Sequence, residues 1–122
     1  MKCVVTGATG FIGNKLCEVL ADDGHQVIAM QRGDCHLPHV IENYRVDFAV
    51  EPLQLPSMDG VDVVFHLAAK ARVQPSIENP IEYHNTNVNG TLNMLDACRR
   101  YGVKRFIFSS SSSVYGDVEQ LP

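Results

Sequence analysis

The sequence has no long apolar run, no strong excess of one charge and no close pair of cysteines. No stretch approaches the roughly 20 apolar residues of a membrane-spanning helix, so we expect no membrane partner. The 14 acidic and 10 basic residues give a net charge of −4, which offers no electrostatic reason to expect nucleic acid as a partner. The four cysteines are scattered and no signal-peptide pattern precedes the first strand-like run, so we expect reduced thiols and a cytoplasmic protein.

Metal ligands are equally sparse. The segment Cys35-His36-Leu37-Pro38-His39 has suitable residue types, but no second cluster accompanies it. We therefore interpret it as a polar loop and expect no metal site. Cys3 and Cys17 lie within apolar runs and are expected to be small core residues.

The 122 residues suffice for one domain and are too few for two. Apolar runs alternate with segments of helical periodicity. The runs predict strands at 2–5, 27–30, 44–46, 61–69 and 105–108, with mostly irregular connections at 32–43 and 48–60. Apolar strands alternating with helices predict an α/β fold, a doubly wound parallel sheet covered on both faces, with strand order 3-2-1-4-5.

Two helices are expected. The first covers 11–21, carries the apolar stripe Ile12, Leu16 and Leu20, and ends at Gly24. The second is expected to begin at Asn79 as N-cap, with Pro80 in its first turn and Glu82 completing a capping box, and to end at Gly102. Its expected inward positions are Ile81, Val88, Leu92 and Leu95.

The sharpest motif is Thr6-Gly7-Ala8-Thr9-Gly10-Phe11-Ile12-Gly13, which lies between the first strand and the first helix. Small residues let the backbone turn tightly and approach a pyrophosphate, while the helix N-terminus offers N–H groups and a partial positive charge. A glycine-rich turn without a ligand is the alternative. The strand–turn–helix context favours dinucleotide binding.

This glycine spacing resembles that of the short-chain dehydrogenase/reductase family. Four further segments, in the expected order, are similar to its extended branch: Asp47-Phe48, His66-Leu67-Ala68-Ala69, Asn87-Val88-Asn89-Gly90-Thr91, and the run from Ser109 to Gly116. The resemblance covers essentially the whole chain and is strongest to UDP-glucose 4-epimerases and related nucleotide-sugar epimerases and dehydratases. It implies an NAD(P)-binding Rossmann domain over residues 1–122, incomplete because the last strands and the substrate domain are missing.

The resemblance also implies a set of cofactor-binding residues. Those of the glycine turn are Gly7, Thr9, Gly10, Phe11, Ile12 and Gly13. Asp47 and Phe48 would flank the adenine, while Leu67, Ala68 and Ala69 would pass beneath the cofactor. Lys70 could reach a phosphate and Asn87 would face the cofactor. Alternatives remain: Asp47 as a turn cap, Lys70 as a solvated loop residue, and Asn87 in a purely structural hydrogen bond.

For cofactor choice, the end of the second strand matters most. Gln31 stands where NAD-preferring epimerases tend to carry aspartate, and Arg32 stands where NADP-preferring relatives place an arginine that pairs with a 2′-phosphate. The prediction therefore leans slightly to NADP, with NAD left open.

Ser111 matches the position of the family's catalytic serine or threonine, which hydrogen-bonds the substrate oxygen. The family's Tyr-x-x-x-Lys pair is absent, because none of the four tyrosines is followed four residues later by lysine, and Glu119 holds that place after Tyr115. Without general acid–base help the chain is expected to be inactive alone, as a piece of a longer protein.

Three functions stay open. The first is part of a nucleotide-sugar epimerase or dehydratase that works by transient hydride transfer. The second is an NADPH-dependent reductase of a small carbonyl substrate, and the third is a non-catalytic cofactor-binding module. The fifth strand, exposed as a sheet edge, would also tend to pair with another copy, so a homodimer is possible.

Overall fold

The computed structural model describes residues 1–34, 36–50 and 53–117, and Cys35 of the segment considered for metal binding lies outside them. Its strands form one parallel sheet in the predicted order β3-β2-β1-β4-β5. The strands are β1 (Lys2–Thr6), β2 (Gln26–Gln31), β3 (Glu42–Arg45), β4 (Val63–His66) and β5 (Arg105–Phe108). β1 lies in the middle of the sheet, as expected for a strand buried on both faces.

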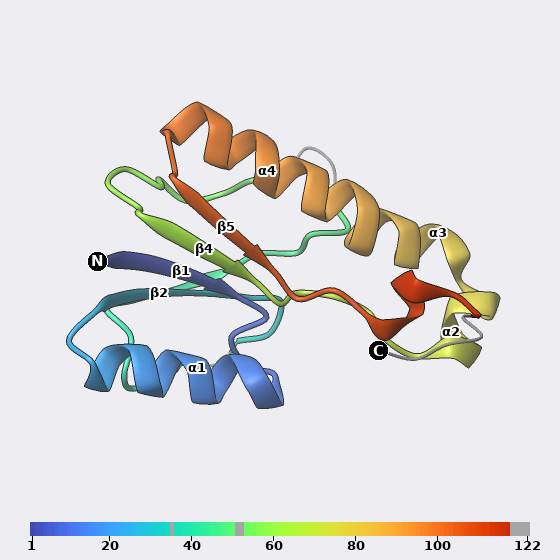
Figure 1. The fold of residues 1–122 in the computed structure, drawn as a ribbon, viewed down its shortest axis with the longest axis horizontal. Coiled ribbons are helices and arrows are strands. Elements are labelled where there is room, and N and C mark those ends of the chain that lie inside the picture. Colours follow the sequence, from blue (N-terminus) through green and yellow to red (C-terminus); the bar gives the residue numbers. More distant parts are fainter. Residues whose placement is uncertain (35, 51–52, 118–122) are drawn as a thin grey trace.

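Helices cover both faces of the sheet (Figure 1). Helix α1 (Phe11–Asp22) lies on one face. On the other face, α3 (Pro80–His84), a π-helical turn (Asn85–Asn89) and α4 (Gly90–Tyr101) follow one another directly. The sequence did not predict the short helix α2 (Val73–Glu78) or the 3₁₀ turn Ser112–Tyr115. No helix in the described part of the chain has the length and apolar character needed to cross a membrane.

The predicted stripe of α1 is confirmed at Leu16, which packs against the core, and at Leu20, which is buried, but it is wrong at Ile12, which is 63% exposed. Gly13 and Cys17 are buried as well. Glycine at position 13 lets the start of α1 pack against Gly7 and Ala8, so the buried face begins there and not at Ile12. The predicted end is confirmed: Gly24 has φ +79° and its N–H bonds back to the carbonyl of Ala21.

The buried face predicted for the long helical segment 80–101, which comprises α3, the π-helical turn and α4, is wrong. Ile81, Val88, Leu92 and Leu95 are all exposed, and the buried residues are Gly90, Met94, Ala97 and Cys98. The helix carries two apolar faces, and the one with small residues allows the closer approach. A Cβ at Gly90 would lie 2.9 Å from the Cβ of Phe48, so only glycine fits there.

The predicted start of this long helix is partly wrong as well. Asn79 precedes Pro80, as expected, but its side chain makes no capping hydrogen bond. Glu82 pairs with the Lys70 ammonium instead of completing a capping box. The predicted end is confirmed, because Gly102 adopts a left-handed conformation with φ +68°.

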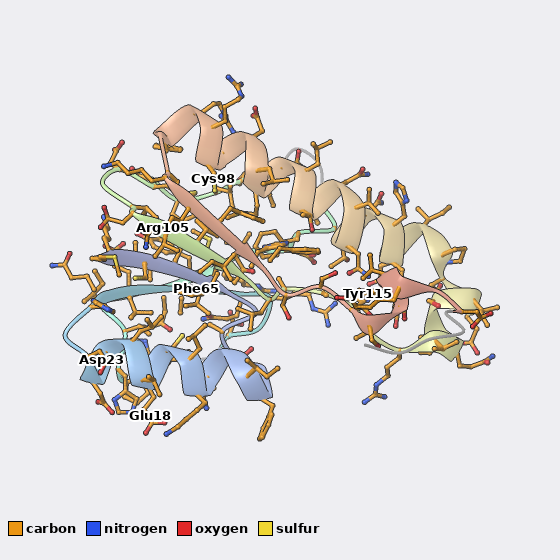
Figure 2. The ribbon with its side chains drawn as sticks, in the orientation of Figure 1. Glu18, Asp23, Phe65, Cys98, Arg105 and Tyr115 are labelled. Carbon is orange, nitrogen blue, oxygen red and sulfur yellow. The ribbon has the colours of Figure 1, made fainter. Side chains whose placement is uncertain are left out.

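Successive residues of a strand point to opposite faces of the sheet and belong to two separate hydrophobic cores. Cys3, Val5 and Val63 belong to the core beneath α1, which also includes the buried Cys17. Val4 and Val64 belong to the core beneath α4, with Met94, Ala97 and Cys98. Figure 2 shows Cys98 between α4 and the sheet, and Phe65 of β4 packs against the core on the α1 side. The two cores fix the sheet, and the strand ends carry the candidate site.

Candidate functional site

A cleft of about 380 Å³ opens at the carboxyl ends of the central strands. β2 and β4 lie on opposite sides of β1, so the strand order reverses its direction at β1. Open α/β sheets bind their ligands at such a reversal. The lining residues come from the loops that follow four strands and from the π-helical turn: Gly7, Thr9, Gly10, Gln31, Arg32, Gly33, Asp47, Phe48, Leu67, Ala68, Ala69, Lys70 and Thr86. These residues come from five separate stretches of the sequence, and the fold of the sheet brings the stretches together.

The glycine turn has the geometry that close backbone approach requires. Gly7 has φ +65°, and a Cβ there would lie 3.0 Å from the backbone of Leu67 and Ala68. A Cβ at Gly13 would lie 2.3 Å from the Gly7 carbonyl oxygen, a clash no side chain tolerates. Gly10 is the N-cap of α1, and no side chain caps it and no acidic residue stands in the first turn. The first N–H groups of α1 therefore remain available to an anion.

The end of β2 contributes Gln31, and the loop after it contributes Arg32. Gln31 is 3% exposed, and Arg32 is exposed with its guanidinium 4.0 Å from the Glu82 carboxylate. After β3, the Asp47 carboxylate accepts a hydrogen bond from the Ala49 N–H at 3.0 Å, which is the turn-capping role left open above. Asp47 also lines the cleft, so the structure shows both a structural contact and a place beside the ligand space.

The loop after β4, residues 67–70, forms the floor of the cleft. The Lys70 ammonium pairs with the Glu82 carboxylate and lies 5.6 Å from the centre of the Tyr83 ring. The Asn87 side chain donates to the Lys70 carbonyl and accepts from the Lys70 N–H, each at 2.8 Å. Asn87 thus makes the structural hydrogen bonds considered as an alternative, and it lines a neighbouring cavity of about 400 Å³ rather than this cleft.

Two cleft residues were missed by the sequence reasoning. Thr86 lines the cleft, and its buried hydroxyl oxygen has no hydrogen-bond partner among the described residues. Glu82 does not line the cleft itself but pairs with two residues that do, Arg32 and Lys70. Neither has a local sequence signal, since both come from the helical segment 80–89 and reach loops that are far away in sequence.

A buried histidine lies behind the floor. His66, 1% exposed, has its Nδ1 2.9 Å from the Thr6 hydroxyl and its Nε2 3.1 Å from the Thr91 hydroxyl. Aromatic rings surround it, with Phe48 edge-on at 5.7 Å and Phe106 at 5.5 Å between ring centres. Burial lowers the pKa of His66 from 6.5 to about 4, so the imidazole is neutral at neutral pH.

Five predicted site residues do not line the cleft, namely Phe11, Ile12, Gly13, Asn87 and Ser111. Phe11 is 98% exposed and Ile12 is 63% exposed, and both line a separate apolar surface on α1. Ser111 is exposed and accepts a hydrogen bond from the Ser113 N–H at 3.2 Å, as N-cap of the 3₁₀ turn. Figure 2 shows Tyr115 on the same segment, beyond the end of β5. The catalytic role of Ser111 stays a prediction.

Known proteins of similar sequence point to the same kind of dinucleotide-binding domain. The model of the NAD dependent epimerase/dehydratase family matches residues 3–122. The chain is 41% identical over 118 residues to a 2-alkyl-3-oxoalkanoate reductase of Stenotrophomonas maltophilia (strain K279a), covering 93% of this chain and 34% of the reductase. It is 34% identical over 135 residues to a UDP-glucose 4-epimerase of Klebsiella pneumoniae, covering 100% of this chain and 97% of that protein.

Solved structures agree with these relatives. MoeE5 in complex with UDP-glucose and NAD superposes with a TM-score of 0.85 at 36% identity, over 100% of this chain and 40% of MoeE5. A UDP-galactose 4-epimerase superposes with a TM-score of 0.83 at 36% identity, over 99% of this chain and 42% of that one. The chain thus spans 34–42% of three of the four proteins named. With the glycine turn, the strand order and a family match across nearly every residue, the chain belongs to the NAD-dependent epimerase/dehydratase family.

Proposed function

We propose that this chain is the NAD-binding portion of a nucleotide-sugar epimerase or dehydratase that acts by transient hydride transfer. The observation that carries the proposal is the cleft at the carboxyl ends of β1, β2 and β4, which is lined by Gly7, Thr9 and Gly10 beside the uncapped start of α1. MoeE5, a structural neighbour, is described with UDP-glucose and NAD. When bound, the dinucleotide supplies the hydride acceptor.

The residues present fit such a cofactor. Glycine at positions 7 and 13 lets the turn pack tightly against the backbone of Leu67, Ala68 and Gly7, and the uncapped N-terminus of α1 favours a phosphate. We propose that Asp47 and Phe48 flank the adenine and that Leu67, Ala68 and Ala69 pass beneath the dinucleotide. The Thr86 hydroxyl, buried and without a partner among the described residues, is a further hydrogen-bonding group for the ligand.

We propose NAD rather than NADP as the cofactor. The Glu82 carboxylate lies beside Arg32 and pairs with Lys70, so both cations of the cleft rim share one acidic partner. A 2′-phosphate near Arg32 would meet that carboxylate, and like charges at close range repel. The slight lean to NADP drawn from Arg32 alone finds no support in MoeE5, whose described cofactor is NAD.

Ser111 is proposed to hydrogen-bond the reacting oxygen of the substrate. Proton transfer requires a base, and these 122 residues contain no Tyr-x-x-x-Lys pair. We therefore propose that the chain alone binds cofactor without turning over a nucleotide sugar. A second candidate, reduction of a small carbonyl substrate, is favoured by the identity of 41% to the Stenotrophomonas reductase. Cofactor released as NAD(P)⁺ in each cycle of a complete protein would indicate the reductase.

The test is a titration of the chain with NADH and with NADPH, followed by nicotinamide fluorescence. We expect saturable binding with NADH tighter than NADPH. Gly13→Ala should abolish binding, because its Cβ would lie 2.3 Å from the Gly7 oxygen and displace the turn. Gly24→Ala, at the other end of α1, meets no atom within 4 Å but strains the backbone at φ +79°. It therefore controls for lost stability without damage to the turn, and the folded variant should bind as the wild type does. A folded wild-type chain that binds neither dinucleotide would refute the proposal.

A further inference from the structure

The Thr6 hydroxyl has only one way to place its proton. Its oxygen accepts hydrogen bonds from the backbone N–H groups of Leu67 at 3.1 Å and Ala68 at 3.0 Å. A hydroxyl oxygen has two acceptor sites and one proton to donate. With both acceptor sites filled, the proton goes to the remaining neighbour, Nδ1 of His66 at 2.9 Å.

This assignment fixes the tautomer of His66. Because Nδ1 accepts, the neutral imidazole carries its proton on Nε2. Nε2 therefore donates to the Thr91 hydroxyl at 3.1 Å, and Thr91 donates in turn to the Asn87 carbonyl at 2.7 Å. The five hydrogen bonds run in one direction, from the loop after β4 to the π-helical turn. We call Thr6, His66 and Thr91 the histidine relay.

The apolar surroundings of His66 make any other arrangement of its ring protons unfavourable in free energy. The ring of His66 lies among Phe48, Phe106 and Phe108, with centre-to-centre distances of 5.7, 5.5 and 6.1 Å. No charged group contributes to its lowered pKa, which burial alone accounts for. A buried polar network of this kind is stable only when every member has a partner, and here each ring nitrogen has one.

The relay reaches the cleft through the loop 67–70. Thr6 holds the first two N–H groups of this loop, at the place where a Cβ on Gly7 would lie 3.0 Å from Ala68. Asn87 holds the other end through both backbone groups of Lys70. Thr91 bonds the carbonyl of the same Asn87, so His66 connects the two ends of the loop through the π-helical turn.

We propose that the histidine relay, with the His66 proton on Nε2, is a positioning device that fixes loop 67–70 as the floor of the cleft and thereby sets the cofactor affinity. His66, Thr6 and Thr91 are positioning residues, since none of the three lines the cleft. The cofactor part of this inference rests on the proposed function. The tautomer part stands on the hydrogen bonds alone.

The first test needs no substitution. Long-range ¹H–¹⁵N correlation spectra of the wild-type chain at neutral pH report which ring nitrogen of His66 carries the proton. We expect an unprotonated Nδ1 and a protonated Nε2 in one slowly exchanging form. A proton on Nδ1, or a mixture of both tautomers, would overturn the relay.

The second test separates positioning from simple structural support. Thr91→Val keeps the shape of the side chain but leaves Nε2 of His66 without its acceptor, whereas Thr91→Ser keeps the hydroxyl. Leaving a buried donor unpaired costs enough to weaken NADH binding by about tenfold if the loop shifts. We expect about that loss in Thr91→Val, near-complete recovery in Thr91→Ser, and a changed His66 tautomer signal in Thr91→Val only.

The outcomes are distinct. NADH affinity unchanged in a folded Thr91→Val chain would overturn the positioning role and leave the proposed function intact. A wild-type chain that binds no NADH would overturn the proposed function, and the cofactor role of the relay with it, while its His66 spectrum would still decide the tautomer. If Thr91→Val does not fold, Thr6→Ser against Thr6→Val gives the same comparison from the other end of the relay.

Discussion

Acid should destabilise this fold through His66 in a defined pH window. The imidazole is buried and its pKa is lowered from 6.5 to about 4 by burial. The groups in contact with it, two threonine hydroxyls and three phenylalanine rings, do not titrate in this range. The unfolded chain therefore binds a proton at His66 at a pH where the folded chain does not.

The sign and size follow from proton linkage. Above about pH 6.5 both states carry a neutral imidazole, and the full stability is present. As the pH falls toward 4, only the unfolded state gains the proton, so the free energy of unfolding decreases. A pKa lowered from 6.5 to about 4 corresponds to a loss of about 3 kcal/mol, a large share of the roughly 5–15 kcal/mol of a typical domain. Below about pH 4 this group causes no further loss.

Urea unfolding at a series of pH values, followed by circular dichroism, measures this loss. His66→Gln is the matched variant, because it removes the titration while the exposed carboxylates that also respond to acid stay the same. We expect the stability difference between wild type and variant to shrink by about 3 kcal/mol as the pH falls across the window. A difference that stays constant from pH 7 to 4 would show that His66 is not held neutral by burial, and the reasoning would fail.

Two further changes test the core and the cleft rim. Met94→Ala removes a fully buried side chain beneath α4 and should lower the free energy of unfolding by about 2–5 kcal/mol in the same urea assay, whereas a loss below about 1 kcal/mol would contradict the packing described. Glu82→Gln removes the acidic partner of Arg32 and Lys70, so NADPH affinity should rise relative to NADH in fluorescence titrations, and an unchanged ratio would show that Glu82 does not disfavour a 2′-phosphate.

The strand order and the glycine turn could be predicted because their signals are local. A buried strand, a turn of glycines and a helix stand next to one another at 2–22, and right-handed crossovers then fix the sheet order. The buried face of α4 could not be predicted, since Val88, Leu92 and Leu95 form as good an apolar stripe as the residues that meet the sheet. Packing distance decided it: Gly90 permits contact with Phe48 that a larger residue would prevent.

The candidate site likewise has one part that local motifs predicted and another that depends on tertiary contacts. Gly7, Asp47 and the loop 67–70 were predicted from motifs, and the structure brings them to one cleft. The contacts that Lys70 makes with Glu82 and Asn87 could not be predicted from the sequence, because they form only after the helical segment has folded over the sheet. The capping box predicted for Glu82 used a local rule, and an ammonium brought close by the tertiary fold offered a stronger partner.

Among the described residues, the buried polar side chains are Thr6, Gln31 and His66, at 0%, 3% and 1% exposure. Each is the last residue of its strand, β1, β2 and β4 in turn. Burying an apolar residue at any of these positions would cost less free energy than burying a polar one. The usual preference for apolar buried residues is therefore violated three times along one edge of the sheet. The cleft opens at this edge of the sheet, and the backbone of loop 67–70 must be held in place there without side chains that would fill the cleft. Polar strand ends answer this need, because the Thr6 hydroxyl accepts hydrogen bonds from the Leu67 and Ala68 N–H groups and His66 in turn bonds Thr6, while loop 67–70 itself lines the cleft.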